Sequence, residues 1–95
     1  MVLTLVWDEK KRLSNLKKHR LKFEDAVRFD WGTALIGEDE SMDYGEARMV
    51  ALGWIDTLVV MIYVDATIDE NEETVQIISL RKATKAERKY YAENA

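Results

Sequence analysis

The sequence predicts a single α+β domain spanning residues 1–95, with an antiparallel sheet covered on one side by helices. Its length is enough for one hydrophobic core and too short for two domains, and 47% of its residues are hydrophobic. Apolar segments of strand length follow one another between residues 47 and 81, and charged segments with helical features flank them. The expected order is therefore strand, helix, helix, four strands and helix.

The N-terminal segment predicts a strand followed at once by a helix. Residues 2–7, VLTLVW, are short, apolar and rich in residue types that favour strands. The carboxylate of Asp8 can accept hydrogen bonds from the free amide groups of a first helical turn, so a helix is expected over residues 9–19. Leu13 and Leu16 give this helix a narrow apolar edge, which predicts a surface helix with a basic side.

A second short helix is predicted over residues 23–31, FEDAVRFDW. Phe23, Ala26 and Val27 recur at helical spacing and are expected to pack inward. Trp31 and Gly32 mark its predicted end.

Four further strands are predicted from the apolar runs that follow. Residues 57–66, TLVVMIYVDA, are almost continuously apolar, as in a central strand buried on both faces. Residues 55–56 predict a tight hairpin connection before this strand, and the acidic residues 67–73 predict a turn after it. Residues 33–46 predict a short strand and an acidic loop, and two more strands are predicted over residues 47–55 and 74–81.

The last helix has a clear sequence signal at its start. Thr84 and Glu87 have the spacing of a capping box, in which the hydroxyl and the carboxylate each accept a bond from a backbone amide of the other residue. The helix is predicted to run from this box towards Glu93.

Charge is segregated along the chain. Residues 1–29 carry a net charge of +4, residues 30–75 carry −11, and residues 76–95 carry +3, for a total of −4. If the two basic ends meet in the fold, they form a basic surface that suits RNA or DNA. An ordinary solvated surface is the competing interpretation.

The composition excludes several kinds of site. The chain has no cysteine and one histidine, so thiol nucleophiles and His- or Cys-rich metal sites are absent, and no glycine-rich phosphate loop occurs. The acidic residues 38–43 lack the spacing of a calcium loop, which favours a solvated loop. We therefore expect neither a metal nor a cofactor. No apolar run is long enough to span a bilayer, and the charges follow the apolar start, so a soluble cytoplasmic protein is expected.

The remaining residue types suit one reaction in particular, the cleavage of RNA without a metal ion. The ribose 2′-hydroxyl supplies the nucleophile, so the protein needs a base, an acid and cations for the charge that develops on phosphorus. His19 can titrate near neutral pH, although a structural histidine at the end of a helix is an alternative. Arg48 and Arg81 can bind phosphate in a bidentate manner. Arg48 could equally pair with the acidic residues around it.

Two further candidates have structural explanations of equal or greater weight. Glu87 could act as an acid or base, but the capping box already accounts for it. Tyr91 lies one helical turn later and could be a phenolic acid, a base-stacking residue or a packing residue. Trp31 and Trp54 are more typical of a core or of a protein contact than of a base-stacking surface.

Several motifs resemble those of one family. Trp7, Asp8, Lys11, Asn15 and Lys18-His19 fit the N-terminal pattern W-D-x-x-K-x-x-x-N-x-x-K-H, and FEDA follows at residues 23–26. Glu46-Ala47-Arg48 and Leu52-Gly53 resemble its central segment. Residues 77–91, IISLRKATKAERKYY, are similar to its C-terminal signature. The sequence thus resembles the BrnT toxins of type II toxin–antitoxin systems over nearly its whole length.

This resemblance implies a ribonuclease with a RelE-like fold that inhibits translation. It also implies a BrnA-type antitoxin with a ribbon-helix-helix DNA-binding part, which neutralises the toxin and represses the operon. The chain would then meet DNA only through the antitoxin. The implied catalytic residues are His19, Arg48, Arg81, Glu87 and Tyr91, with acid and base unassigned. The expected RNA-binding residues are Lys18, Lys82, Lys85 and Arg88.

Three positions depart from the family pattern. Arg20 stands where glycine usually ends a helix, Lys22 replaces a capping serine, and Gln76 replaces an arginine near the suspected site. A left-handed cap would strain arginine by about 1 kcal/mol relative to glycine, so either the turn differs here or the helix runs on. The loss of a transition-state cation lowers rates by roughly 10²–10³. The alternative function is therefore a decayed toxin that survives as the antitoxin's partner in operon repression.

Overall fold

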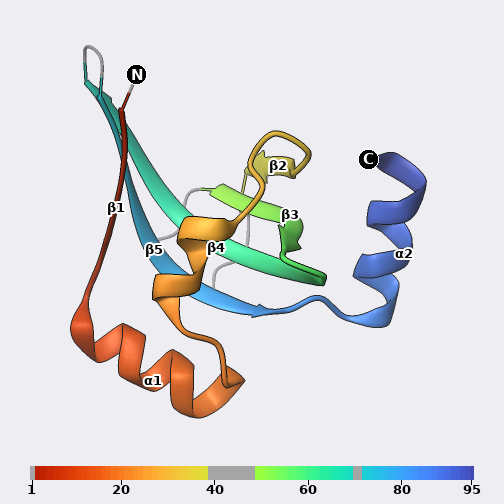
Figure 1. Cartoon of the computed structure of the whole chain (residues 1–95), viewed down its shortest axis with the longest axis horizontal. Helices are drawn as coiled ribbons and strands as arrows, with labels where there is room; N and C mark the ends of the chain where they lie inside the picture. Colours follow the sequence, from red (N-terminus) through yellow and green to blue (C-terminus); the bar gives the residue numbers. More distant parts are fainter. Residues whose placement is uncertain (1, 39–48, 70–71) are drawn as a thin grey trace.

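The computed structural model describes residues 2–38, 49–69 and 72–95, and within them a five-stranded sheet with helices on both faces (Figure 1). The predicted element order is confirmed for this part of the chain. The elements are β1 (Val2–Trp7), α1 (Glu9–His19), the 3₁₀ helix η1 (Phe23–Arg28), β2 (Leu35–Glu38), β3 (Met49–Ile55), β4 (Leu58–Asp69), β5 (Glu72–Lys82) and α2 (Lys85–Asn94).

The strand order is β1-β5-β4-β3-β2, and the sheet is mixed. Strands β2 to β5 form the expected antiparallel meander, but β1 pairs with β5 in parallel, in register from Val2 opposite Glu72 to Trp7 opposite Ile77. The prediction of a purely antiparallel sheet was therefore wrong for one strand pair. Short turns force neighbouring strands to be antiparallel, whereas β1 and β5 are separated by most of the chain and no turn fixes their direction.

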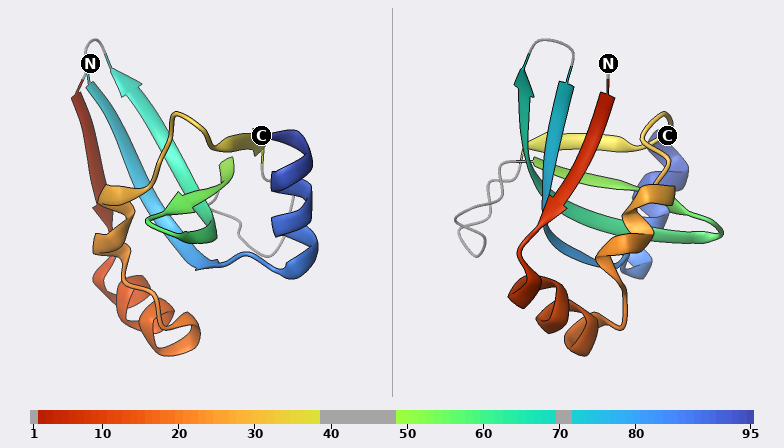
Figure 2. Two further views of the ribbon diagram at one scale, coloured as in Figure 1. Left: turned by 45° about the vertical axis from the view of Figure 1, so that its right-hand side comes forward. Right: turned by 60° about the vertical axis from the view of Figure 1, so that its left-hand side comes forward.

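Helices cover both faces of the sheet, not one face as expected (Figure 2). Alternate residues of β4 point to opposite sides. Val60 and Ile62 pack with η1 in the larger core, whereas Val59 packs with Tyr91 of α2 in a smaller one. The sequence prediction missed this division because periodicity shows that a strand is buried on both faces but not which helix covers each face.

The helix α1 packs through a polar residue instead of its predicted apolar edge. Asp8 caps it, accepting hydrogen bonds from the amides of Lys10 and Lys11. Leu13, however, is 53% exposed, and Asn15 is the buried residue of the helix. Its hydrogen bonds to β5 decide which side of α1 faces the protein.

The second helical segment is a 3₁₀ helix, which changes its inward residues. Phe23, Ala26 and Phe29 are buried, whereas Val27 is 75% exposed. A 3₁₀ helix has three residues per turn, so every third residue shares a face. The expectation that Val27 packs inward assumed α-helical spacing and was wrong.

The predicted strands are present, with shifted ends. The β3–β4 hairpin turns at Asp56 and Thr57, and Asp56 has a positive φ of 54°. Strand β4 extends to Asp69 and β5 begins at Glu72, so most of the expected acidic turn is strand. The predicted acidic loop lies mainly at 39–46, outside the described residues. No described helix has the length and apolar character needed to cross a membrane.

Candidate functional site

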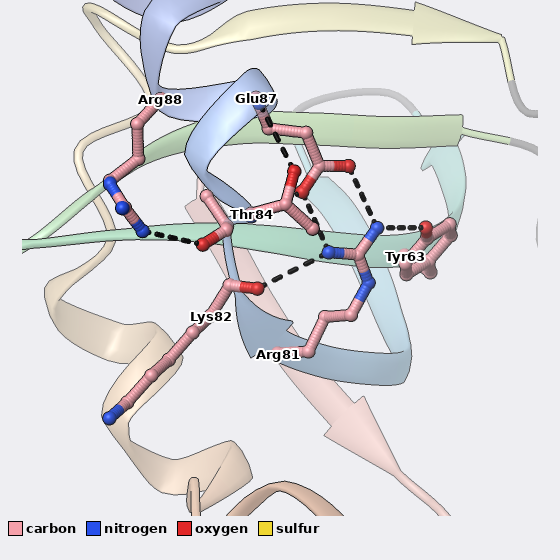
Figure 3. Close-up of polar contacts among 7 residues, drawn as sticks. Tyr63, Arg81, Lys82, Thr84, Glu87 and Arg88 are labelled. Atoms are coloured by element: carbon pink, nitrogen blue, oxygen red, sulfur yellow. Dashed lines mark hydrogen bonds and ion pairs between the residues drawn. The ribbon is translucent and has the colours of Figure 1, made fainter.

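The junction between β5 and α2 carries four of the candidate charged residues, Arg81, Lys82, Glu87 and Arg88 (Figure 3). Strand β5 ends at Lys82, and Thr84 caps α2 as predicted. The Glu87 amide donates to the Thr84 hydroxyl at 3.1 Å, and the Thr84 amide donates to Glu87 Oε1 at 2.8 Å. This capping box fixes Glu87 over the end of β5.

Arg81 is the centre of this junction. Its Nη1 donates to Glu87 Oε1 at 2.7 Å and its Nη2 donates to Glu87 Oε2 at 2.9 Å, a bidentate ion pair. Nη1 also donates to the backbone oxygen of Lys82 at 3.2 Å, and Nη2 donates to the Tyr63 hydroxyl at 3.0 Å. Both terminal nitrogens therefore use their full donor capacity.

The pair strongly shifts the protonation equilibria of both partners. Hydrogen bonds from Arg81 lower the pKa of Glu87 to about 2, and hydrogen bonds to Glu87 raise the pKa of Arg81 above its ordinary value. The side chains are 22% and 24% exposed, so the pair is only partly screened by solvent. Glu87 is thus ionised at neutral pH and a very weak base in this arrangement.

Sequence reasoning missed Tyr63, the phenol that contacts the candidate site. The Arg81 guanidinium carbon lies 5.7 Å from the centre of the Tyr63 ring, in addition to the hydroxyl contact. Arg81 pairs with Met61 across β4 and β5, and Tyr63 lies two residues further along β4 on the same face. Pairing the two predicted strands as a hairpin would have revealed this diagonal contact.

His19 lies at the end of α1, the helix that packs beside β5. Burial, followed by the positive charges of Lys18 and Arg81, lowers the pKa of His19 below 6.5. His19 is therefore mainly neutral at pH 7, the form that accepts a proton. The charge of Arg81 is the smallest of these three causes, and α1, which carries His19, packs against β5, which carries Arg81.

The other predicted cations lie on exposed surface at the ends of the same elements. Lys18 is on α1, Lys82 ends β5, and Lys85 and Arg88 are in the first turns of α2. Arg88 Nη1 donates to the backbone oxygen of Ala83 at 3.0 Å, which helps to hold the junction. The N-terminal and C-terminal basic segments do meet, because β1 and α1 both contact β5.

Tyr91 is part of the smaller hydrophobic core, away from solvent. It is 6% exposed, its hydroxyl donates to the backbone oxygen of Thr33 at 3.0 Å, and Trp54 contacts its ring edge to face at 6.0 Å. This geometry favours the packing interpretation of Tyr91 over the phenolic acid. Arg48 lies outside the described residues.

The three departures from the family pattern have separate outcomes. Arg20 caps α1 in the left-handed conformation, with φ 61°, so the expectation that the turn differs or the helix runs on was wrong. Lys22 precedes η1 without a side-chain capping bond. Gln76 lies five residues before Arg81 on β5, roughly 15 Å along the strand. The missing arginine at 76 therefore removes a cation from another part of the surface, not from the contacts of Arg81.

Among the described residues, no three His, Cys, Asp or Glu side chains lie together as a metal site would require. The described junction is instead a cationic site of Arg and Lys side chains, with a Tyr hydroxyl beside Arg81, at the C-terminal end of β5.

These features define a small α+β protein with a cationic site where β5 meets the last helix, α2. Residues 7–87 match the profile of the ribonuclease toxin BrnT of type II toxin–antitoxin systems. The chain belongs to this BrnT family. It is also similar to the 1.1 Å crystal structure of the Brucella abortus ribonuclease toxin, BrnT, with a TM-score of 0.67 and 24% identity over 90% of this chain and 100% of that chain. No curated protein matches the sequence.

Proposed function

We propose that this toxin cleaves RNA without a metal ion, using the ribose 2′-hydroxyl as nucleophile, and so inhibits translation in the cytoplasm. Membership of a ribonuclease toxin family supports the reaction class. The observation that carries the site assignment is the set of cations at the β5–α2 junction, Arg81 among them. His19, whose pKa is lowered by burial, lies on α1, the helix that packs against β5.

In this mechanism Arg81 binds the scissile phosphate and stabilises the charge that develops on it. His19 removes the proton of the 2′-hydroxyl, because its lowered pKa keeps it neutral at pH 7. Lys18, Lys82, Lys85 and Arg88 attract the RNA backbone. Arg48, Glu87 and Tyr91 stay candidates for further catalytic contacts, although the contacts of Glu87 and Tyr91 favour positioning and packing roles.

The partner that we propose is a BrnA-type antitoxin with a ribbon-helix-helix DNA-binding part, since the family belongs to toxin–antitoxin systems. The toxin then reaches DNA only through the antitoxin. We also propose that the fold is RelE-like, which the resemblance of the sequence motifs supports.

A decayed toxin that acts as the antitoxin's partner in operon repression is the second candidate. The four donors on Nη1 and Nη2 of Arg81 are occupied by residues of its own chain, which favours this alternative. It predicts tight binding of the antitoxin without toxicity.

The deciding experiment incubates antitoxin-free protein with total RNA in excess EDTA. We expect the parent to cleave RNA, to spare DNA of the same sequence, and to lose activity on Arg81→Ala. Arg28→Ala is the matched control, because Arg28 is an ion-paired arginine with the same charge that contacts Asp25 and Asp56 instead of α2. Intact RNA with the parent, together with antitoxin binding, would support the decayed toxin.

A further inference from the structure

The face of Arg81 that binds anions is already occupied by a carboxylate of the same chain. Glu87 Oε1 and Oε2 accept bonds from Nη1 and Nη2 at 2.7 and 2.9 Å. The fork of an arginine binds the two oxygens of a carboxylate and two oxygens of a phosphate in the same way. Glu87 therefore lies where a phosphate bound to Arg81 would lie.

The remaining donors leave little room for both anions. Nη1 and Nη2 each donate a second bond, to the Lys82 backbone oxygen and to the Tyr63 hydroxyl. A phosphate can make an end-on bidentate contact with Nη1 and Nη2 of Arg81 only after Glu87 has moved away. Exchange of one anion for the other leaves Arg81 neutralised in both states, so the two compete directly.

We propose that Glu87 is an internal competitor of the RNA phosphate, and that the described conformation is a closed state from which RNA must displace it. This inference rests on the proposed function, because it takes RNA as the ligand of Arg81. Glu87 Oε1 also accepts a bond from the Thr84 amide, so displacement of the carboxylate opens that half of the capping box. The other half, from the Glu87 amide to the Thr84 hydroxyl, does not involve the carboxylate and can still hold the start of α2.

The capping box also gives a selective variant. Glutamine is as suitable as glutamate at this position of a capping box, so Glu87→Gln keeps the acceptor for Thr84 and removes the charge that binds Arg81. Glu93→Gln is the matched control, because it removes one negative charge from the same helix at an exposed position. The two variants have the same net charge, so a difference between their affinities for RNA cannot come from the overall charge of the protein.

The experiment measures binding of a short RNA with 2′-O-methyl groups, which the proposed reaction cannot cleave. We expect Glu87→Gln to bind about tenfold more tightly than Glu93→Gln, because a carboxylate in contact with the phosphate site is removed. Adding Arg81→Gln to Glu87→Gln should abolish this gain. Equal or weaker binding by Glu87→Gln, or a gain that persists without Arg81, would overturn the inference.

Cleavage of unmodified RNA is measured separately in the same variants. If neither the parent nor Glu87→Gln cleaves RNA, the proposed reaction fails, while a gain in binding still supports the competitor. A second measurement uses the parent alone, in case Glu87→Gln does not fold. The pKa of the Glu87 carboxyl, followed by NMR, should rise when the 2′-O-methyl RNA is added. An unchanged pKa at saturating RNA would contradict displacement.

Discussion

The side chain of Asn15 takes the place of a strand beside Leu80. Its Nδ2 donates to the Leu80 oxygen at 2.8 Å, and the Leu80 amide donates to its Oδ1 at 3.0 Å. Strand β1 pairs with β5 only as far as Ile77, so this part of β5 has no strand on that side. The carboxamide supplies the donor and acceptor that the neighbouring backbone would have supplied, one residue before Arg81.

Replacement of Asn15 should therefore destabilise the protein strongly. Asn15→Ala leaves a buried amide and a buried carbonyl without partners, so the free energy of unfolding should fall by about 2–4 kcal/mol. Urea denaturation measures this change. Asn94→Ala removes an exposed side-chain bond on α2 and should change stability by less than about 0.5 kcal/mol. A similar small loss at Asn15 would show that water replaces its bonds.

Replacement of Arg20 by glycine should stabilise the protein. Arg20 has a φ of 61°, a conformation that strains residues with a Cβ atom. Arg20→Gly should raise the free energy of unfolding by about 1 kcal/mol and the melting temperature by about 4–8 °C. Lys22→Gly is the control, because Lys22 has a φ of −93° and no strain to relieve. This variant should not raise the free energy of unfolding. An equal gain at both positions would exclude relief of strain as the cause.

The Glu87–Arg81 pair should make stability depend on acid pH. The pKa of Glu87 is about 2 in the fold and 4.5 in its absence, so its stabilising contribution is complete above pH 4.5 and is lost as the pH falls towards 2. At pH 7 the parent should exceed Glu87→Gln by roughly 1–2 kcal/mol, because the pair is partly screened. Denaturation from pH 7 to pH 2 should show this difference shrinking. Glu93→Gln should differ little from the parent throughout.

His19 should act as a base whose activity is lost at low pH. Burial and neighbouring cations lower its pKa below 6.5, so protonation removes the active form only below that pH. His19→Ala should reduce RNA cleavage by roughly 10²-fold or more, and the pH profile should lose its acidic limb. His19→Gln tests whether a side chain that can form hydrogen bonds, but cannot accept the proton, is enough for RNA cleavage. A profile that is unchanged in both variants would remove His19 from the mechanism.

Arg81→Ala should lower stability as well as activity. Arg81 holds the half-buried Glu87 and contacts Tyr63. Its removal should cost about 1–3 kcal/mol. A double-mutant cycle compares the free energies of unfolding of Arg81→Ala, Glu87→Gln and the double variant, each measured by urea denaturation. The coupling energy between the two residues should account for most of the loss caused by Arg81→Ala.

The elements that followed local rules were predicted well. The bounds of β1 and α1 agree with the expectation, and both helix caps, at Asp8 and Thr84, form as predicted. These elements and caps depend on interactions between residues that lie within a few positions of one another in the sequence. Val27 was misplaced because the short helix adopted a different period, and Leu13 was misplaced because a buried asparagine outweighed an apolar edge.

The candidate site was predicted in part. Arg81 and Glu87 are close in sequence, and their common position followed from the strand, the turn and the capping box. Tyr63 was missed because its contact with Arg81 depends on the register of β4 against β5. Tyr91 lies on the same helix as Glu87, but its burial depends on a sheet face that the sequence did not assign to α2.

The sequence by itself determined the order of elements, the caps, the segregation of charge and the collection of cations around Arg81. These properties depend on local hydrogen bonding, hydrophobic period and covalent order. Only the tertiary structure decided that β1 runs parallel to β5, that helices cover both faces, and that Glu87 occupies the anion-binding face of Arg81. Such relationships depend on strand register and on which surfaces exclude water together, and no local segment specifies them.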